Sequence, residues 1–206
     1  MISVRRRATV LALGLCLLTL TLTGCGGASD PAPAPTPVPA ARYRVPVERL
    51  PDGWRASNPR EGGYRTTFCG VDLEPTAPVD SARYRFAKGP VGPFLEQQIR
   101  SYAQNTAADV IGAIRTALPG CREFEAAGDE SSPAVRFTVE PLSLPSVAAS
   151  SPDTVAWRQQ PADGSGVVSD VVLTRRGTTA VVLVAYSLRD GPDRDALTAA
   201  LAAVPQ

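Results

Sequence analysis

Side chains able to perform acid–base or nucleophilic chemistry are scarce, because the chain contains no histidine. That absence excludes Ser-His-Asp and Cys-His nucleophile systems and the HExxH zinc helix. Lys88 is the only lysine, and no serine precedes it at the spacing of a Ser-Lys dyad. Glu123 and Glu125 would share one face of a strand, where paired carboxyl groups about 5 to 9 Å apart could hydrolyse glycosides. A solvated strand face explains them more simply, so we expect no enzyme and no catalytic residue.

Two further patterns resemble functional sites only superficially. Residues 163–167 read DGSGV, as in a nucleophile elbow, but they lie between expected strands and predict a turn. Asp190, Asp193 and Asp195 could suggest calcium, yet acids at the start of a helix also interact favourably with its dipole. We expect no metal site and no cofactor.

Cys25 directly follows an apolar segment and is the most informative cysteine. Arginines at 5–7 precede an uncharged run at 8–22, the arrangement of a secretory signal peptide. That run is shorter than the roughly 20 residues that cross a bilayer. The sequence LTGC at 22–25 resembles a bacterial lipobox, which implies cleavage between Gly24 and Cys25 and lipidation of Cys25. The alternative is an ordinary signal peptide ending in cysteine by chance; Sec and Tat export both remain open.

Cys69 and Cys121 remain as a pair after Cys16 is removed with the signal peptide and Cys25 is lipidated. Disulfides persist in an exported compartment, so we predict a Cys69–Cys121 bridge. Closing a loop of this length would contribute roughly 4 kcal/mol of stability. The alternative is two free thiols.

Composition divides the chain into three parts. Residues 1–24 form the predicted signal peptide, and residues 25–41 hold the lipidated cysteine and a proline-alternating stalk of extended polyproline II. Residues 42–206 have the size of one extracellular domain. This domain is nearly neutral and lacks the basic stripe that nucleic-acid binding requires, so no nucleic acid is expected.

The domain pattern predicts an α+β fold, an antiparallel sheet with one long and one C-terminal helix packed on it. Apolar residues recur at three or four positions along residues 93–118, which predicts the long amphipathic helix. Residues 193–204 predict the second helix. Strands are expected around Phe68 and Cys69 and at residues 81–89, 121–127, 134–142 and 153–160, with a valine-rich hairpin turning at residues 175–177. Residues 47–59 are turn-rich and expected to be irregular.

Aromatic residues could line a pocket for an apolar or sugar ligand, although such residues more often form core. Trp54, in a proline- and glycine-rich segment, is the weak candidate for a ligand-cleft edge, whereas Trp157 is expected to pack under a helix. Arg83 and Arg85, on the expected outer strand face, could meet anionic lipid or a wall polymer; ordinary solvation is the simpler explanation. The aromatic set is Trp54, Tyr64, Phe68, Tyr84, Phe86, Phe94, Tyr102 and Trp157.

Two sequence patterns resemble the PknH-type extracellular sensor domain of actinobacterial receptor kinases and free-standing lipoproteins. They are the segment 94–121, which ends in a cysteine, and the pair of valine-rich strands that flank an Arg-Gly turn at 170–186. The resemblance spans roughly residues 68–204. It implies a sheet with helices around a cleft and a ligand-sensing role. Such kinase domains commonly carry two disulfides, whereas only one is possible here, which puts in doubt any cleft geometry that needs the second.

The preferred function is a lipid-anchored, non-catalytic sensor-like or ligand-binding module on the extracytoplasmic face of the cell membrane. Its ligand would be a small amphiphile, a lipid or a cell-wall component, in a concave apolar pocket between the sheet and the long helix. The alternative is a structural or accessory protein that docks a membrane-protein partner, which predicts a large exposed apolar patch instead.

Overall fold

The computed structural model describes residues 38–59, 67–126, 134–144 and 151–206. The predicted signal peptide, Gly24, Cys25 and nearly all of the predicted stalk lie outside these residues. Ala34–Gln206 forms one compact unit. Both hydrophobic clusters and the disulfide of the described chain lie within this unit, so it contains the contacts needed to fold without residues 1–33.

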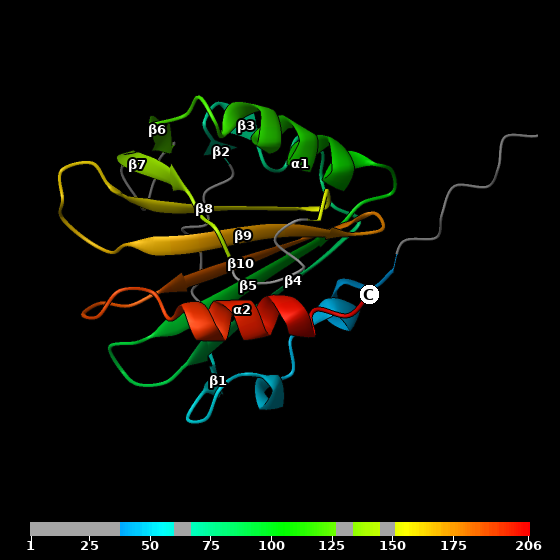
Figure 1. Ribbon diagram of the computed structural model, residues 1–206. Coiled ribbons are helices and arrows are strands. Elements are labelled where there is room, and N and C mark those ends of the chain that lie inside the picture. Colours follow the sequence, from blue (N-terminus) through cyan, green and yellow to red (C-terminus); the bar gives the residue numbers. More distant parts are fainter. Residues whose placement is uncertain (1–37, 60–66, 127–133, 145–150) are drawn as a thin grey trace, which may run out of the picture. The chain divides into compact units, whose positions relative to one another are not determined.

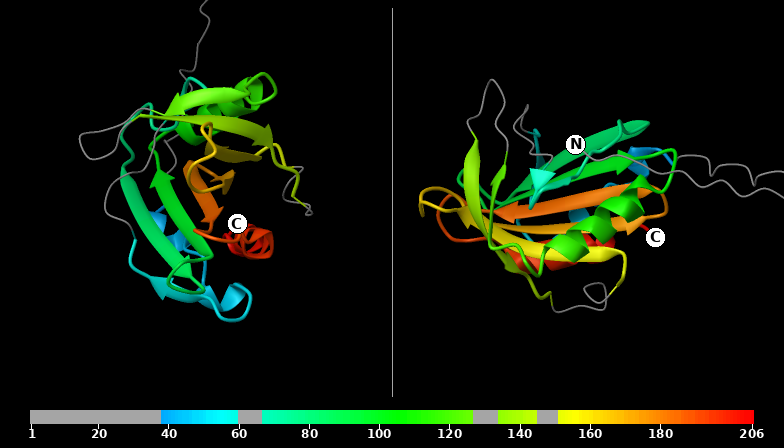
Figure 2. Two further views of the ribbon diagram at one scale, coloured as in Figure 1. Left: turned by 90° about the vertical axis from the view of Figure 1, so that its left-hand side faces the viewer. Right: turned by 90° about the horizontal axis from the view of Figure 1, so that it is seen from above.

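An antiparallel sheet of eight strands, in the order β1-β4-β5-β10-β9-β8-β7-β6, forms the body of the domain (Figure 1). Its strands are β1 (Arg55–Ser57), β4 (Asp80–Ala87), β5 (Phe94–Ser101), β6 (Glu123–Ala126), β7 (Val135–Pro141), β8 (Thr154–Pro161), β9 (Ser169–Arg176) and β10 (Thr179–Tyr186). The sheet is strongly curved when viewed end-on (Figure 2). With two packed helices it confirms the α+β class.

Valine-rich β9 and β10 form the predicted central hairpin. Val181 lies opposite Thr174, and Gly177 in the turn has φ +58°, a backbone conformation that glycine adopts without a steric penalty. Alternate residues of β10 enter different cores: Val181 and Leu183 face one side of the sheet, Val182 the other. The hairpin is therefore buried on both faces.

The prediction of one continuous helix over residues 93–118 is wrong in its first half. Residues 94–101 form β5, which is buried along its whole length, and helix α1 spans only Thr106–Ala117. Leu95 and Ile99, four residues apart, fit a helical stripe, but they equally fit one face of a strand with side-chain period two. Polar residues concealed the strand, because Glu96 and Gln98 are buried on its second face and Gln97 is buried on the same face as Leu95 and Ile99.

Helices α1 and α2 lie on opposite faces of the sheet (Figure 1). α1 contributes Val110, Ile111 and Ile114 to a core with Leu173 and other residues of β8–β10. α2 (Arg194–Ala203) contributes Leu197 and Leu201 to the second core. Neither helix, nor any other in the described ranges, is long and apolar enough to cross a membrane.

Asp193 caps α2, as its position predicted. Its side chain accepts a hydrogen bond from the backbone N–H of Ala196 at 2.9 Å, which satisfies a donor that the first helical turn leaves open. The acid therefore serves the helix start rather than a calcium site.

The N-terminal segment packs on the α2 face and is held by polar contacts from β5. It contains two 3-10 helices, η1 (Ala40–Tyr43) and η2 (Val47–Arg49). The buried Gln97 amide accepts from the Val45 N–H at 3.0 Å and donates to the Tyr43 carbonyl at 2.8 Å. Ala40 is fully buried, so packing begins ahead of residue 42, where the sequence analysis placed the domain boundary.

Short elements complete the fold. Residues 47–59, expected to be irregular, include η2 and the three-residue edge strand β1. The hairpin of β2 (Thr67–Phe68) and β3 (Val71–Asp72) lies beside α1. The Cys69–Cys121 disulfide, predicted from the sequence, ties this hairpin to the segment that follows α1, with its Cα atoms 6.0 Å apart.

A buried carboxylate connects β8, β9 and α2. Asp170 of β9 is fully buried and accepts two hydrogen bonds from the Arg158 guanidinium, at 2.6 and 2.9 Å. Arg194 of α2 donates a third at 3.0 Å. The hydrogen bond to Asp170 is the largest cause that raises the pKa of Arg158. Both arginines therefore depend on one carboxylate.

Candidate functional site

A cavity of about 350 Å³ opens on the α1 face of the sheet. This volume is within the range of small-molecule sites. Side chains of β2 and of β5 to β10 line the cavity, whereas no residue of α1 does. The expectation of a pocket between the sheet and the long helix is therefore corrected: the curved sheet itself provides most of the walls.

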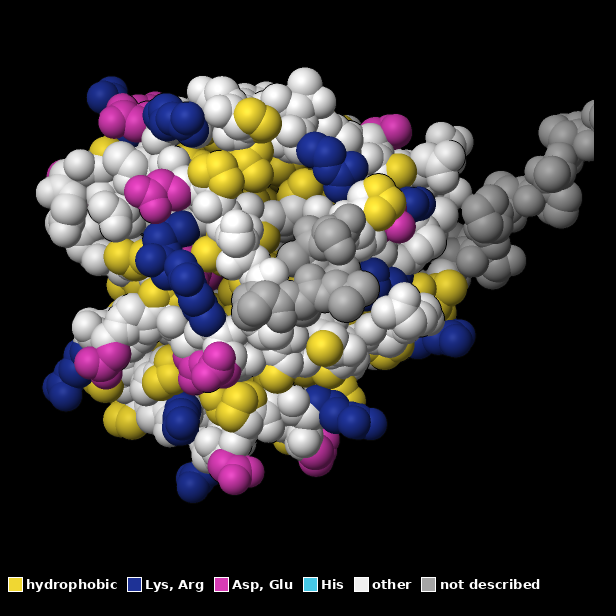
Figure 3. Space-filling view, in the orientation of Figure 1, with side chains coloured by type: hydrophobic (Ala, Val, Ile, Leu, Met, Phe, Trp, Pro, Cys, Tyr) yellow, Lys and Arg dark blue, Asp and Glu magenta, His cyan; other side chains and the backbone are white. Residues whose placement is uncertain are grey.

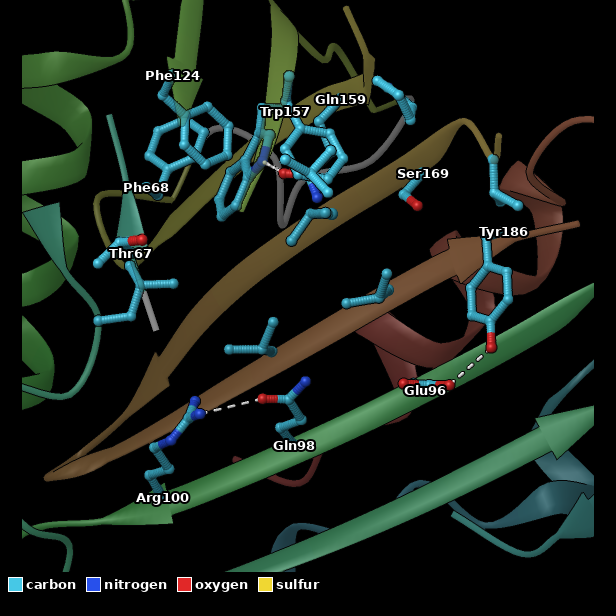
Figure 4. A pocket seen from close by; sticks show the side chains of 18 of the residues that line it. Thr67, Phe68, Glu96, Gln98, Arg100, Phe124, Trp157, Gln159, Ser169 and Tyr186 are labelled. Atoms are coloured by element: carbon cyan, nitrogen blue, oxygen red, sulfur yellow. Dashed lines mark hydrogen bonds between the residues drawn. The ribbon is translucent and has the colours of Figure 1, made fainter. Parts of the chain in front are cut away.

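One wall of the cavity is aromatic (Figure 4). Phe68 packs on Trp157 with ring centroids 4.2 Å apart and on Phe124 at 5.2 Å. Phe137 extends the row, stacked on Phe124 at 5.5 Å. Such ring pairs add stability beyond their buried area, so this wall is a preformed apolar surface. Val171, Val182 and Val184 continue it across the sheet.

The facing wall comes from β5 and is polar. Glu96, Gln98 and Arg100 alternate along the strand, so all three point to the cavity side. Arg100 donates to Glu74 at 2.7 Å and to the Gln98 side-chain carbonyl at 3.1 Å. Its charge is therefore neutralised by a carboxylate of the same chain.

Glu96 belongs to a second neutral group at the other end of this wall. Its carboxylate accepts from the Tyr186 hydroxyl at 2.7 Å, and the same hydroxyl accepts from Arg85 at 3.1 Å. Burial first, and the hydrogen bond to Glu96 second, raise the pKa of Tyr186 to about 12. Tyr186 therefore stays protonated at neutral pH and acts as a hydrogen-bond donor, not as a base.

Predicted site residues are distributed over both faces of the sheet. Trp54 is only 6% exposed in the α2-side core and does not line the cavity. Phe68 and Trp157, also in the aromatic set, do line it, whereas Tyr64 lies outside the described residues. Trp157 is thus both a core and a cavity residue.

Of the two β4 arginines, one agrees with the sequence prediction and the other does not. Arg83 is exposed. Arg85, expected on a solvated outer face, is half-buried, with its guanidinium 3.6 Å from Glu96 and over the Phe94 ring at 4.2 Å. Acidic and basic side chains are interspersed on the face shown in Figure 3.

Candidate catalytic and metal groups do not converge in the described part of the chain. Glu123 and Glu125 are exposed on β6, outside the cavity. The Asp163 side chain accepts from the N–H and hydroxyl of Ser165, which makes the predicted turn. No three potential ligands among His, Cys, Asp and Glu cluster within the described ranges.

Glu96, Gln98 and Arg100 were missed by the sequence analysis, which placed them on a helix. The sequence offers little signal for this strand, because Gln97, on the same face as Leu95 and Ile99, is also polar and breaks the alternation of apolar and polar residues.

Comparison with known proteins places the fold. No family model matches the chain, and no curated protein matches it in sequence. Among solved structures it is similar to the extracellular domain of PknH from Mycobacterium tuberculosis, with a TM-score of 0.52 and 10% sequence identity. The match covers 82% of this chain and 96% of that one. The fold implied by the sequence resemblance is thereby confirmed.

Proposed function

We propose that this chain, which shares its fold with the extracellular domain of a PknH protein, is a non-catalytic ligand-binding module of the cell surface. The observation that carries the proposal is the cavity of about 350 Å³, with its aromatic wall facing a polar one. Such a site suits a small amphiphile, a lipid or an envelope component. The lipobox-like LTGC at 22–25 supports membrane anchoring through Cys25.

The surface favours this function over the docking of a membrane protein. Val79 and Leu188 are the exposed large hydrophobic residues of the described chain. Val79 bonds to the Ser101 end of β5, and Leu188 follows Tyr186, which pairs with the Phe94 end. They lie at opposite ends of the sheet and make no contiguous patch of the size that marks a stable interface.

Native mass spectrometry of the Ala34–Gln206 domain, purified from an exporting host, tests whether the cavity is occupied. We expect an additional mass that disappears on denaturation and identifies the class of ligand. A bare, oxidised domain that also acquires no ligand from envelope extracts contradicts the proposal. That outcome favours an accessory role, which cross-linking at the membrane would then examine.

Val184→Phe should obstruct the cavity and leave the fold intact. Val184 lines the cavity from β10 and is only partly buried, so a larger ring can enter the empty space. We expect ligand affinity to fall at least about tenfold, or 1.4 kcal/mol, by titration with intrinsic tryptophan fluorescence as the readout. Val79→Phe, at a side chain 54% exposed outside the cavity, is the matched control. Equal affinities in both variants would place the ligand elsewhere.

Cys25→Ser should abolish membrane anchoring. Lipidation requires the thiol, and each buried acyl CH₂ contributes about 0.8 kcal/mol to membrane binding. Fractionation of cells that express the full chain should show release from membranes or an unprocessed precursor. Unchanged cleavage and membrane retention would rule out the lipobox.

A further inference from the structure

We infer that the cavity binds an uncharged amphiphile that carries hydrogen-bond acceptors, such as an acyl ester, and receives hydrogen bonds from Gln98 and Gln159. This inference rests on the proposed binding function and specifies its ligand class. Two observations support it. The charged groups of the cavity already have partners within the protein, and two glutamine side chains are held with their NH₂ groups toward the cavity.

The charged groups of the cavity already have partners. Among the described residues that line it, Glu96 and Arg100 are the charged ones. Arg100 is only 5% exposed and is bonded to Glu74 at 2.7 Å; Glu96, 6% exposed, is bonded to Tyr186 and lies near Arg85. The charge of a charged ligand would have no opposite charge beside it in this site, unless the ligand displaced an existing partner of Glu96 or Arg100. Burial of an unpaired charge is strongly unfavourable, so the site disfavours both anions and cations.

Gln98 presents a donor to the cavity. Its side-chain oxygen accepts from Arg100, and a guanidinium has no acceptor atoms. The oxygen must therefore face Arg100, which leaves the NH₂ group on the other branch of the amide. Gln98 is 7% exposed, and its nitrogen points into the cavity in Figure 4. The described chain shows no acceptor for this nitrogen.

Gln159 is oriented in the same way from the opposite wall. Its side-chain oxygen accepts from the Trp157 indole N–H at 2.9 Å, and an indole N–H can only donate. The Gln159 NH₂ group is therefore directed away from Trp157 and toward the cavity (Figure 4), where the Ser169 hydroxyl also points. Within the described ranges this NH₂ group, too, has no protein acceptor.

Two amide donors thus flank an aromatic and valine-lined space, one on β5 and the other on β8. A ligand that enters the cavity displaces water from these donors, and a donor then left without an acceptor would cost about 1 to 3 kcal/mol, so the site favours a ligand that supplies acceptors. Ester and amide carbonyl oxygens are neutral acceptors attached to apolar chains. An acylated, uncharged molecule satisfies the donors, the aromatic wall and the charge balance together.

Three amphiphiles with the same chain length but different charges test which ligand charge the cavity accepts. Monodecanoylglycerol is neutral and carries an ester, decanoate is anionic, and decyltrimethylammonium is cationic. Each is titrated below its micellar concentration into the Ala34–Gln206 domain, with intrinsic tryptophan fluorescence as the readout. We expect monodecanoylglycerol to bind about tenfold or more tightly than either ion.

Gln98→Glu and Gln159→Glu test the two donors. Each substitution keeps an oxygen for Arg100 or Trp157 and replaces the NH₂ donor with a negatively charged acceptor. Affinity for monodecanoylglycerol should fall about tenfold in each variant, and affinity for decyltrimethylammonium should rise. Gln160→Glu, at the exposed neighbour outside the cavity, is the matched control and should change neither affinity. Far-ultraviolet circular dichroism checks that each variant is folded.

The possible results distinguish this inference from the proposed function. Equal or tighter binding of decanoate, or unchanged affinities in both Gln→Glu variants, would overturn the neutral-acceptor inference. If Val184→Phe still prevented the binding of these amphiphiles, the cavity would remain a ligand site. Failure of all three amphiphiles, with a bare domain in native mass spectrometry, would overturn both.

Discussion

Asp170→Asn should lower the free energy of unfolding by about 3 kcal/mol. The substitution removes a fully buried negative charge that accepts hydrogen bonds from Arg158 and Arg194, and it places an amide NH₂ group among their donors. The two arginines would then lack a shared counter-charge in the layer between the sheet and α2. Urea denaturation of the Ala34–Gln206 domain measures the change.

Asp153→Asn is the matched control for this change. Asp153 also receives two hydrogen bonds from one arginine, Arg175, at 2.6 and 2.9 Å. The side chains of that pair are 38% and 29% exposed, and such pairs contribute about 1 kcal/mol or less. Similar losses in the two variants would mean that burial does not determine the importance of Asp170.

Removal of the disulfide should have an effect of the same order. Cys69→Ser combined with Cys121→Ser opens a loop whose ends are 52 residues apart, which in the chain-entropy account costs about 4 kcal/mol. Because Cys69 directly follows Phe68, the β2–β3 hairpin would also lose its covalent link beside the aromatic wall. We therefore expect weaker ligand binding together with a lower midpoint of urea denaturation.

Two measurements check the disulfide prediction. Thiol alkylation followed by mass determination should modify no cysteine in the native domain and two after reduction. Reduction of the unsubstituted domain should then reproduce the stability loss of the double variant. Full alkylation before reduction, or a double variant as stable as the oxidised domain, would contradict the structure.

Strands with a regular pattern could be predicted from the sequence. In β4, Ala82, Tyr84 and Phe86 alternate with arginines and enter or border the α2-side core. In β10 the valines indicated a strand buried on both faces. The disulfide followed from the exported location and from having two cysteines left to pair. Each inference used local pattern or composition, and the local pattern agreed with the tertiary structure.

The cavity could not be predicted, because its polar wall departs from those patterns. Glu96, Gln98 and Arg100 are buried although their types favour exposure, so β5 resembled one turn of an amphipathic helix. Their partners are distant in sequence: Arg100 bonds to Glu74, and Glu96 to Tyr186. Sequence reasoning therefore failed where local rules are broken, as expected at a functional site.

The strand order also has a consequence for how the domain forms. β6 to β10 follow one another as a meander, and β4 pairs with β5, so both groups can assemble from nearby segments. The pairing of β5 with β10 is different, since Leu95 lies opposite Ala185, 90 residues further along the chain (185 − 95). Such non-local contacts close large loops and form slowly.

The cavity lies across the pairing of β5 with β10, which forms late. Its polar wall belongs to β5, and most of its aromatic wall belongs to the meander. As the chain emerges with its N-terminus first, β5 can pair with β4 at once, but its other edge must wait for β10, the last strand. A ligand that contacts both walls would therefore act as a clamp across the junction of the two halves of the sheet.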